Sequence, residues 1–325
     1  MRRIPVFVAL PVLLAGALVL LLISLIWGSV PVPLAELPAS LLNDEQSMAR
    51  TVVWQLRFPR AMTALAVGAL LALSGALLQV MLRNPLADPY VLGVSGGASV
   101  AALLGIMIGM PAAGVDGMAA MGALAASLLV FTLAQGPGGW TPTRLLRTGI
   151  VVAAGAGSLV SLLLALSDDT RLRGMVSWLL GDLSRTTRWP WLLCLATLAT
   201  LSSVAIGRQL NVLARGEILA ATLGLNVQRM HVLLFSVTSL LTGVAVSAAG
   251  SIGFVGLITP HLVRSVTGSD NRIVLPASAL LGGILLAAAD LASRVVAAPR
   301  QLPVGALTAM IGVPVFLLLM SRQKY

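Results

Sequence analysis

The chain has 325 residues, of which 58% are hydrophobic and only 10% are charged, with a mean hydropathy of +0.98 and a formal net charge of +10. Soluble domains carry about a quarter of their residues as charged side chains, so this composition excludes a soluble domain and indicates a polytopic membrane protein. The arginines are scattered along the sequence rather than gathered in one run, which argues against a nucleic-acid-binding role.

Single residues limit the chemistry that this chain can perform. Lys324 is the only lysine, and it lies in the C-terminal tail, so no glycine-rich loop with a following Lys and Ser or Thr exists. The chain therefore lacks a P-loop with which to hydrolyse ATP. Cys194 is the only cysteine, which excludes an intrachain disulfide and a cysteine-cluster metal site, and we expect it to pack in the core. We predict no catalytic residue, no metal site and no cofactor on the chain.

Ten apolar runs follow one another along the sequence and are expected to cross the membrane as helices. Arg2 and Arg3 precede the first run, which is too long for a signal-peptide core, so the N-terminus is expected in the cytoplasm. An even number of spans places the C-terminus there as well. The expected spans cover residues 6–27, 61–82, 91–110, 117–135, 148–166, 191–207, 231–249, a short one within 250–262, 273–296 and 304–320. Between the fifth and sixth, residues 168–188 are expected to form a helix at the outer mouth.

The longest polar interruption in the C-terminal half covers residues 208–230. Within it, a short helix from Glu217 is expected to end at Gly224, and Asn226 is placed to cap a second short helix. A loop that only joins two spans needs two to eight residues, so this ordered loop is expected to contact a partner. An interfacial connector without a partner is the alternative.

Few ionisable groups lie in or beside the predicted spans. Asp290 is the only carboxylate well inside one, and Arg294 follows it by four residues, so a functional acid and a local ion pair are both open. Asp182 at the outer mouth fits a role in translocation or a solvated charge. His261 has no neighbouring ligands for a metal, and His231 is expected at the interface.

Four stretches together resemble one family, the permease subunits of binding-protein-dependent ABC importers for metal chelates such as vitamin B12, haem and ferric siderophores. These stretches are RFPRAMTALAVGALLALSGALLQ from Arg57, RNPLADPYVLGVSGGA from Arg83, GEILAATLGLNVQRM from Gly216 and GSIGFVGLITPHLVR from Gly250. They occur in the family's order and span most of the chain.

The resemblance implies an architecture and a set of partners. It implies an all-α fold with ten transmembrane helices per subunit, residues 1–325 forming one permease domain, in a bacterial inner membrane. Such permeases form homodimers with the pathway on the two-fold axis. Two ATP-binding subunits, which carry the ATP and Mg²⁺, lie on the cytoplasmic side, and a periplasmic substrate-binding protein docks on the other. Membrane lipid and a metal chelate complete the partners.

The resemblance also suggests how particular residues act. The loop 208–230 corresponds to the element that couples to the ATPase, in which small residues permit close contact and Glu217 can pair with a basic group of the partner; its expected contact residues are Glu217, Ala220, Ala221 and Gly224. The turn at Asn84 and Pro85 resembles the cytoplasmic gate, although a purely structural turn explains Asn84 equally well.

Three arginines are expected to dock the binding protein. Arg57 and Arg60 flank a Phe-Pro pair at the mouth of the second span, and Arg294 lies at the outer end of the ninth. Their guanidinium groups are suited to holding carboxylates at two points. Anchoring to lipid headgroups is the alternative for all three.

The competing function is an ion-coupled secondary transporter or a channel. That class requires ionisable groups or broken helices near the middle of the membrane, and it often shows duplicated halves. The sequence offers Asp290 and little else, and no duplication is evident.

Overall fold

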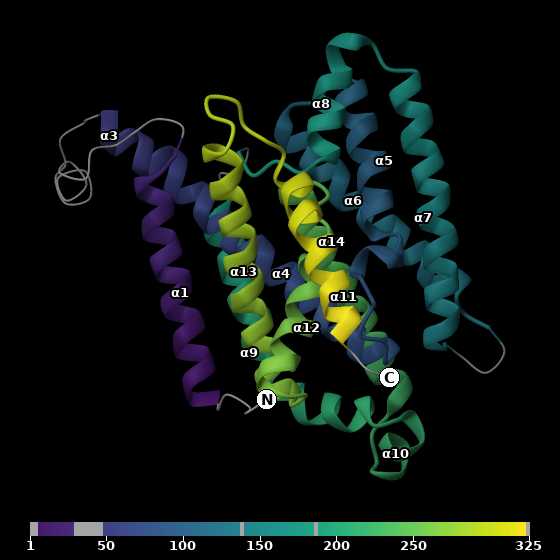
Figure 1. Cartoon of the computed structure of the whole chain (residues 1–325). Coiled ribbons are helices and arrows are strands. Elements are labelled where there is room, and N and C mark those ends of the chain that lie inside the picture. Colours follow the sequence, from purple (N-terminus) through teal and green to yellow (C-terminus); the bar gives the residue numbers. More distant parts are fainter. Residues whose placement is uncertain (1–5, 29–47, 137–139, 185–187, 323–325) are drawn as a thin grey trace.

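The computed structural model describes residues 6–28, 48–136, 140–184 and 188–322, and this part of the chain forms helices joined by turns, with no β-strand (Figure 1). The helices are α1 (Val6–Ile26), α3 (Met48–Thr51), the π-helical η2 (Val52–Arg57), α4 (Phe58–Leu82), the 3₁₀ turn η3 (Pro89–Leu92), α5 (Val94–Met107), α6 (Ala112–Leu133), α7 (Pro142–Ala165), α8 (Asp169–Leu179), α9 (Trp189–Ala214), α10 (Glu217–Thr222), α11 (Val227–Ala249), α12 (Val255–Thr267), α13 (Asn271–Val295) and α14 (Val304–Arg322).

Each of the ten predicted runs is a helix, but their lengths differ. Seven helices of the described chain are long and apolar enough to cross a membrane, whereas α5 and residues 304–319 of α14 are shorter apolar segments, and α12 has only 13 residues. A break precedes α12, within the stretch GSIGFVGLITPHLVR: α11 is capped by Gly250, and the backbone resumes a helix only after Phe254, whose φ of 71° is unusual for a residue with a side chain. The predicted outer-mouth helix is α8.

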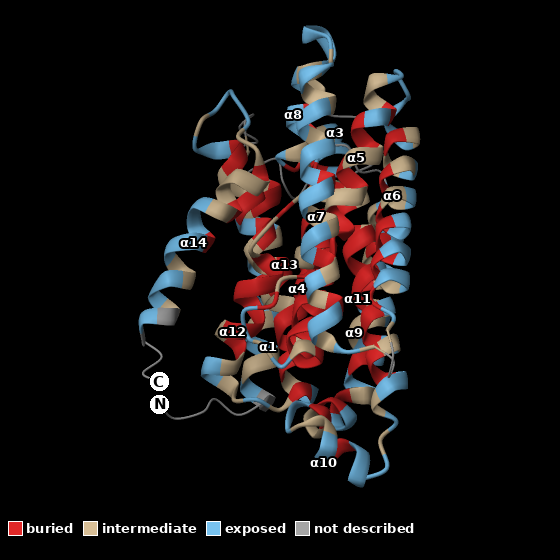
Figure 2. Ribbon diagram, turned by 90° about the vertical axis from the view of Figure 1, so that its right-hand side faces the viewer, coloured by how far each residue is buried: buried red, intermediate tan, exposed pale blue. Residues whose placement is uncertain are grey.

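Helix α4 is the centre of the bundle. Helix α13 packs along it, and α9, α11 and α12 surround it (Figures 1 and 2). In the most apolar 18-residue stretch of Val52–Leu82, which comprises η2 and α4, 83% of the residues are buried. The corresponding stretch of α7 is only 11% buried. The large buried cluster runs from α4 through α5, α6, α11 and α13, so the described helices share one main core.

Glycines allow α4 to contact its neighbours through the backbone. A Cβ added to Gly68 would lie 2.2 Å from the carbonyl oxygen of Gly282 on α13, and one added to Gly75 would lie 1.9 Å from that of Gly256 on α12. No side chain fits at such distances, so these crossings depend on residues that let two backbones meet.

The bundle has two distinct ends (Figure 1). Helix α10 projects at one end, called here the α10 end, where α1 begins and α14 finishes. Helix α8 lies at the opposite end, called the α8 end, together with η2 and the start of α4.

Two expectations about single residues were wrong, and a third was right only in part. Cys194 is exposed on α9 rather than packed in the core, because it lies on the face of α9 turned away from α4 and α13. His231 is only 3% exposed rather than interfacial, because it is in the first turns of α11 and packs beneath α10. Asn226 does cap a helix, accepting a hydrogen bond from the backbone N–H of Arg229, but that helix is the long α11.

Candidate functional site: two ends of the bundle

At the α10 end, the loop predicted as a coupling element forms a compact surface. Gly216 precedes α10 with a φ of 127°, and Gly224 ends it with a φ of 84°, conformations that favour glycine. Ile218 is 85% exposed, while Ala220 is fully buried against its own chain. Of the predicted contact residues, Ala221 and Gly224 are exposed on the surface, whereas Ala220 packs beneath the helix.

Glu217 already has basic neighbours within the chain. Its Oε1 lies 3.5 Å from Nη2 of Arg83 and 3.9 Å from Nε2 of His231. The Arg83 contact joins α10 to the loop after α4, two segments that are far apart in the sequence. Because the carboxylate is about one-third exposed, screening by solvent keeps this ion pair weak. The contact therefore serves mainly to position α10 against the loop after α4.

The loop 83–89, predicted as a gate, is held by hydrogen bonds from several sides. Asn84 Oδ1 accepts from the backbone N–H of Leu86 at 2.9 Å, the local turn expected from the sequence. Gln79 Nε2 donates to the carbonyl oxygen of Leu257 on α12 at 3.2 Å, and Gln79 Oε1 accepts from Arg264 Nη1. Gln79 Nε2 also lies 3.4 Å from the carbonyl oxygen of Ala87 in the loop, so the turn at Asn84 and Pro85 is connected to α12 through Gln79.

Asp88 and Tyr90 extend this network to the break before α12. Asp88 Oδ1 caps η3 by accepting from the N–H of Tyr90 at 2.8 Å, and burial raises the pKa of its carboxyl to about 6, with the Tyr90 N–H opposing the shift. The Tyr90 hydroxyl donates to the carbonyl of Ile252 at 2.7 Å and accepts from its N–H at 2.8 Å. One side chain therefore satisfies both polar groups of a non-helical residue.

The three arginines predicted to dock a partner all lie at the α8 end, but they are largely buried. Arg57 Nη1 donates to the carbonyl oxygens of Leu25 and Ile26 at 2.6 and 2.8 Å, where it satisfies carbonyls left open at the end of α1. Arg57 and Arg294 are each 4% exposed. Their docking role stays a prediction, and any docking through them would first have to displace bonds within the chain.

Asp290 holds Arg60 and Arg294 together. Arg60 Nε lies 2.7 Å from Asp290 Oδ1 and Arg294 Nε lies 3.1 Å from Oδ2, while Arg294 Nη2 donates to Ser24 at 2.6 Å. The local pair expected from the four-residue spacing is present. The Arg60 contact joins residues 230 positions apart, so only the tertiary structure could reveal it.

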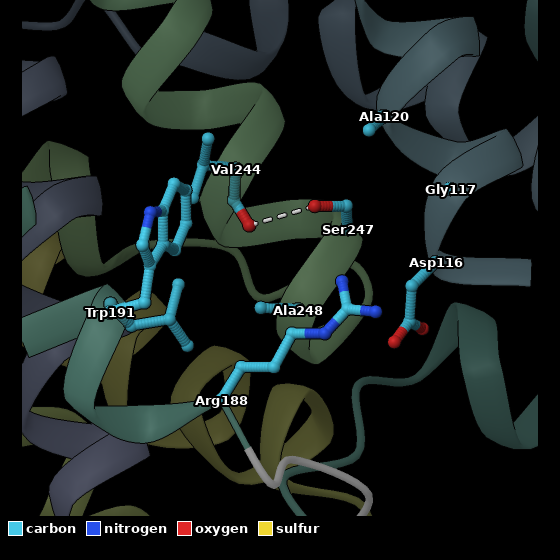
Figure 3. A pocket seen from close by; sticks show the side chains of 9 residues that line it. Asp116, Gly117, Ala120, Arg188, Trp191, Val244, Ser247 and Ala248 are labelled. Carbon is cyan, nitrogen blue, oxygen red and sulfur yellow. Dashed lines mark hydrogen bonds between the residues drawn. The ribbon is translucent and has the colours of Figure 1, made fainter. Parts of the chain in front are cut away.

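A cavity of about 390 Å³ opens at the α8 end between α6, α9 and α11 (Figure 3). Arg188, before α9, and Asp116, on α6, extend toward one another across it, and Trp191 forms a wall. Its lining is largely apolar, and its volume is at the lower end of the range for small-molecule sites. The structure describes no group of three or more metal-ligating side chains in the parts of the chain it covers.

Relatives of this chain are transport proteins. It is 38% identical to the hemin transport system permease protein HmuU of Yersinia pestis over 97% of both chains. It is 39% identical to the vitamin B12 import system permease protein BtuC of Vibrio cholerae, over 89% of this chain and 88% of the relative.

A solved structure agrees with this likeness. An inward-facing conformation of a metal-chelate type ABC transporter matches with a TM-score of 0.84 at 30% identity, covering 96% of this chain and 98% of the other. The family model described as the FecCD transport family matches residues 16–322, nearly the full length. The chain is a member of the FecCD transport family.

Proposed function

We propose that this protein is the membrane permease of an ABC importer that moves a metal chelate, namely cobalamin, haem or a ferric siderophore, into the bacterial cytoplasm. The observation that carries this is full-length similarity to permeases named for hemin and for vitamin B12. All ten apolar segments are transmembrane helices in this proposal, the α10 end is cytoplasmic, and both termini lie on that side. Residues 1–325 act as one domain in the inner membrane.

The partners follow from the two ends and from the exposed helices. Two ATP-binding subunits carrying ATP and Mg²⁺ bind at α10, and a periplasmic binding protein docks at the α8 end. Two copies of this chain pair around the pathway. Helices α7 and α14 support the pairing because they present exposed apolar side chains, among them Val151 (70% exposed) and Met310 (72% exposed), to lipid or to a second subunit.

Transport is coupled through the loop 83–89. Movement of α10 by an ATPase would reach Arg83 through Glu217. Gln79 of α4 bonds both to the loop and to α12, and Tyr90, just after the loop, bonds to the break before α12. Asn84 and Pro85 are proposed to open and close the cytoplasmic side within this connected unit. The substitution Glu217→Gln removes the charge that pairs with Arg83 and therefore perturbs this link.

The function is tested by reconstitution with the cognate ATPase and binding protein in proteoliposomes. Uptake that requires ATP on the ATPase side and persists when ion gradients are collapsed supports the importer. Uptake driven by an ion gradient without ATP supports the secondary transporter. The visible absorption spectrum of the loaded binding protein distinguishes a corrin, a haem and a ferric siderophore.

Replacement of Ala221 by Arg is expected to weaken ATPase binding by at least about tenfold without unfolding the permease. Ala221 is exposed on α10, so the added charge would stay in solvent in the free chain, but it would be desolvated in a close contact. Copurification of the ATPase subunit measures the effect. Val296→Glu, at an exposed apolar position of the α8 end, is the control. ATPase copurification at the unmodified level in Ala221→Arg would show that α10 is not the contact.

Arg60, Arg57 and Arg294 are proposed to receive acidic residues of the binding protein, and Arg60 offers the cleanest test because its side chain is the most exposed of the three, at 10%. Arg60→Gln is expected to lower binding-protein-stimulated ATP hydrolysis at least about tenfold while basal hydrolysis persists. Arg147→Gln, at an exposed arginine of α7 outside the loop 208–230, is the control. Full stimulation at low ionic strength, where screening is weakest, would contradict docking and favour lipid anchoring.

A further inference from the structure

A second cavity, of about 380 Å³, lies at the α10 end between the last turns of α9, helix α10 and the start of α13. It adjoins the loop 208–230, but none of the four proposed ATPase-contact residues, Glu217, Ala220, Ala221 and Gly224, lines it. The cavity is lined by Arg208, Asn211, Val212, Arg215, Leu219, Leu223 and Arg272.

The cavity carries uncompensated positive charge. Arg272 is neutralised by Asp270, since Nη2 lies 2.8 Å from Oδ2, and Asn211 Nδ2 donates to the other carboxylate oxygen at 2.7 Å. The hydrogen bond from Arg272 holds the pKa of Asp270 well below its usual value. Arg208 and Arg215 are exposed and form no ion pair with a carboxylate of the described chain. Two guanidinium groups are thus available to an anion.

The position of these arginines on α9 points toward the bilayer. Cys194, Leu201, Arg208 and Arg215 follow at seven-residue steps, which is nearly two helical turns, and all four are exposed. The first two belong to the apolar part of a membrane-crossing helix. The same outward stripe therefore ends in two arginines about 10 Å apart along the axis, at the level where a span leaves the hydrocarbon.

The cavity is also shaped from within the chain. Arg272 packs directly against α9 at Gly207, where a Cβ would lie 2.8 Å from Arg272 Cγ. Leu219 and Leu223 of α10 line the cavity with apolar side chains. Both leucines are themselves exposed, at 43% and 65%, so they offer apolar surface beside the arginines.

We propose that this cavity binds the phosphodiester headgroup of an anionic phospholipid such as phosphatidylglycerol, held by Arg208 and Arg215. Arginine forks match phosphate oxygens, and basic pockets between helices at the cytoplasmic side of a membrane suit acidic headgroups. A carboxylate of the ATPase subunit has the same charge. The lipid is favoured because both arginines continue the exposed apolar stripe of α9. The proposed ATPase surface lies instead on α10, where Ile218 is exposed. Only the choice of leaflet rests on the proposed topology.

The test uses the full-length permease in detergent, with native mass spectrometry to count bound lipid. Dioleoylphosphatidylglycerol is the probe, dioleoylphosphatidylcholine tests the need for negative charge, and inorganic phosphate tests whether an acyl chain is required. Arg208→Gln with Arg215→Gln is compared with Arg147→Gln with Arg229→Gln, which removes the same charge from exposed arginines outside the cavity. The cavity variant is expected to bind phosphatidylglycerol at least about tenfold more weakly, and the control variant to match the parent.

Four other outcomes would overturn the proposal. Equal phosphatidylglycerol binding by the cavity variant and the parent would show that the arginines do not hold the lipid. Equal binding of phosphatidylcholine by the parent would remove the charge argument. Competition by millimolar inorganic phosphate would make the site one for free phosphate. If the cavity variant lost ATPase copurification in lipid-free detergent but still bound phosphatidylglycerol, the arginines would be assigned to the protein partner. A circular dichroism melt matching the parent confirms that each variant is folded.

Discussion

Replacement of Asp290 by Leu is expected to destabilise the permease by about 3–5 kcal/mol, because it leaves Arg60 and Arg294 without their shared carboxylate in a buried site. Asp290 is fully buried and both arginines are nearly so. The midpoint of thermal unfolding in detergent should fall by roughly 10 °C. Asp168→Asn, at an exposed position of the same end, should leave it unchanged.

A second substitution makes this expectation specific to charge. Asp290→Leu combined with Arg294→Met removes one cation together with the anion and should be less destabilised than the sum of the single variants. Additive losses would show that Asp290 acts through packing alone. An unfolding midpoint for Asp290→Leu within about 2 °C of the parent would contradict the buried-charge argument altogether.

Replacement of Gly75 by Val should prevent stable folding, because the added Cβ alone would lie 1.9 Å from the Gly256 carbonyl oxygen. Neither partner at this crossing is a flexible side chain, so α4 and α12 must separate, and overpacking of a core typically costs about 1–3 kcal/mol or more. Size-exclusion chromatography in detergent would measure the loss of monodisperse protein. Gly68→Val, at the crossing with α13, is expected to behave in the same way.

The control for this prediction lies on the periphery. A Cβ added to Gly157 of α7 would have no neighbouring atom within 4 Å, so Gly157→Val places its side chain in open space and should preserve the elution profile. A monodisperse Gly75→Val variant would mean that the two helices do not meet through their backbones.

Much of the helical architecture was predictable, since a run of apolar residues long enough for a bilayer leaves the backbone little alternative to a helix. The cap at Asn226 and the helix end at Gly224 were also found correctly, because capping and glycine conformations are local. The helix following Asn226 was misjudged, since polar residues of its first turn resemble a loop.

Burial of polar groups was much less predictable. Arg57 and Arg294 were expected to be surface charges because arginine is rarely buried, yet their partners are a distant helix end, a serine and a nearby acid. The Arg83–Glu217 contact and the Arg208–Arg215 cavity were missed because both depend on tertiary structure. Only the exposed seven-residue stripe of α9 carried a sequence signal for the cavity.

The contrast between α4 and α7 has a consequence for biosynthesis. Helix α4 is made early, yet the glycines that let it pack meet residues of α12 and α13, which emerge from the ribosome about 200 residues later. During that interval α4 must wait in the translocon or in lipid, protected by its apolar composition rather than by its final neighbours. Helix α7 makes few buried contacts and does not depend on such late arrivals. The centre of this bundle is therefore completed last, although its central helix is among the first to be synthesised.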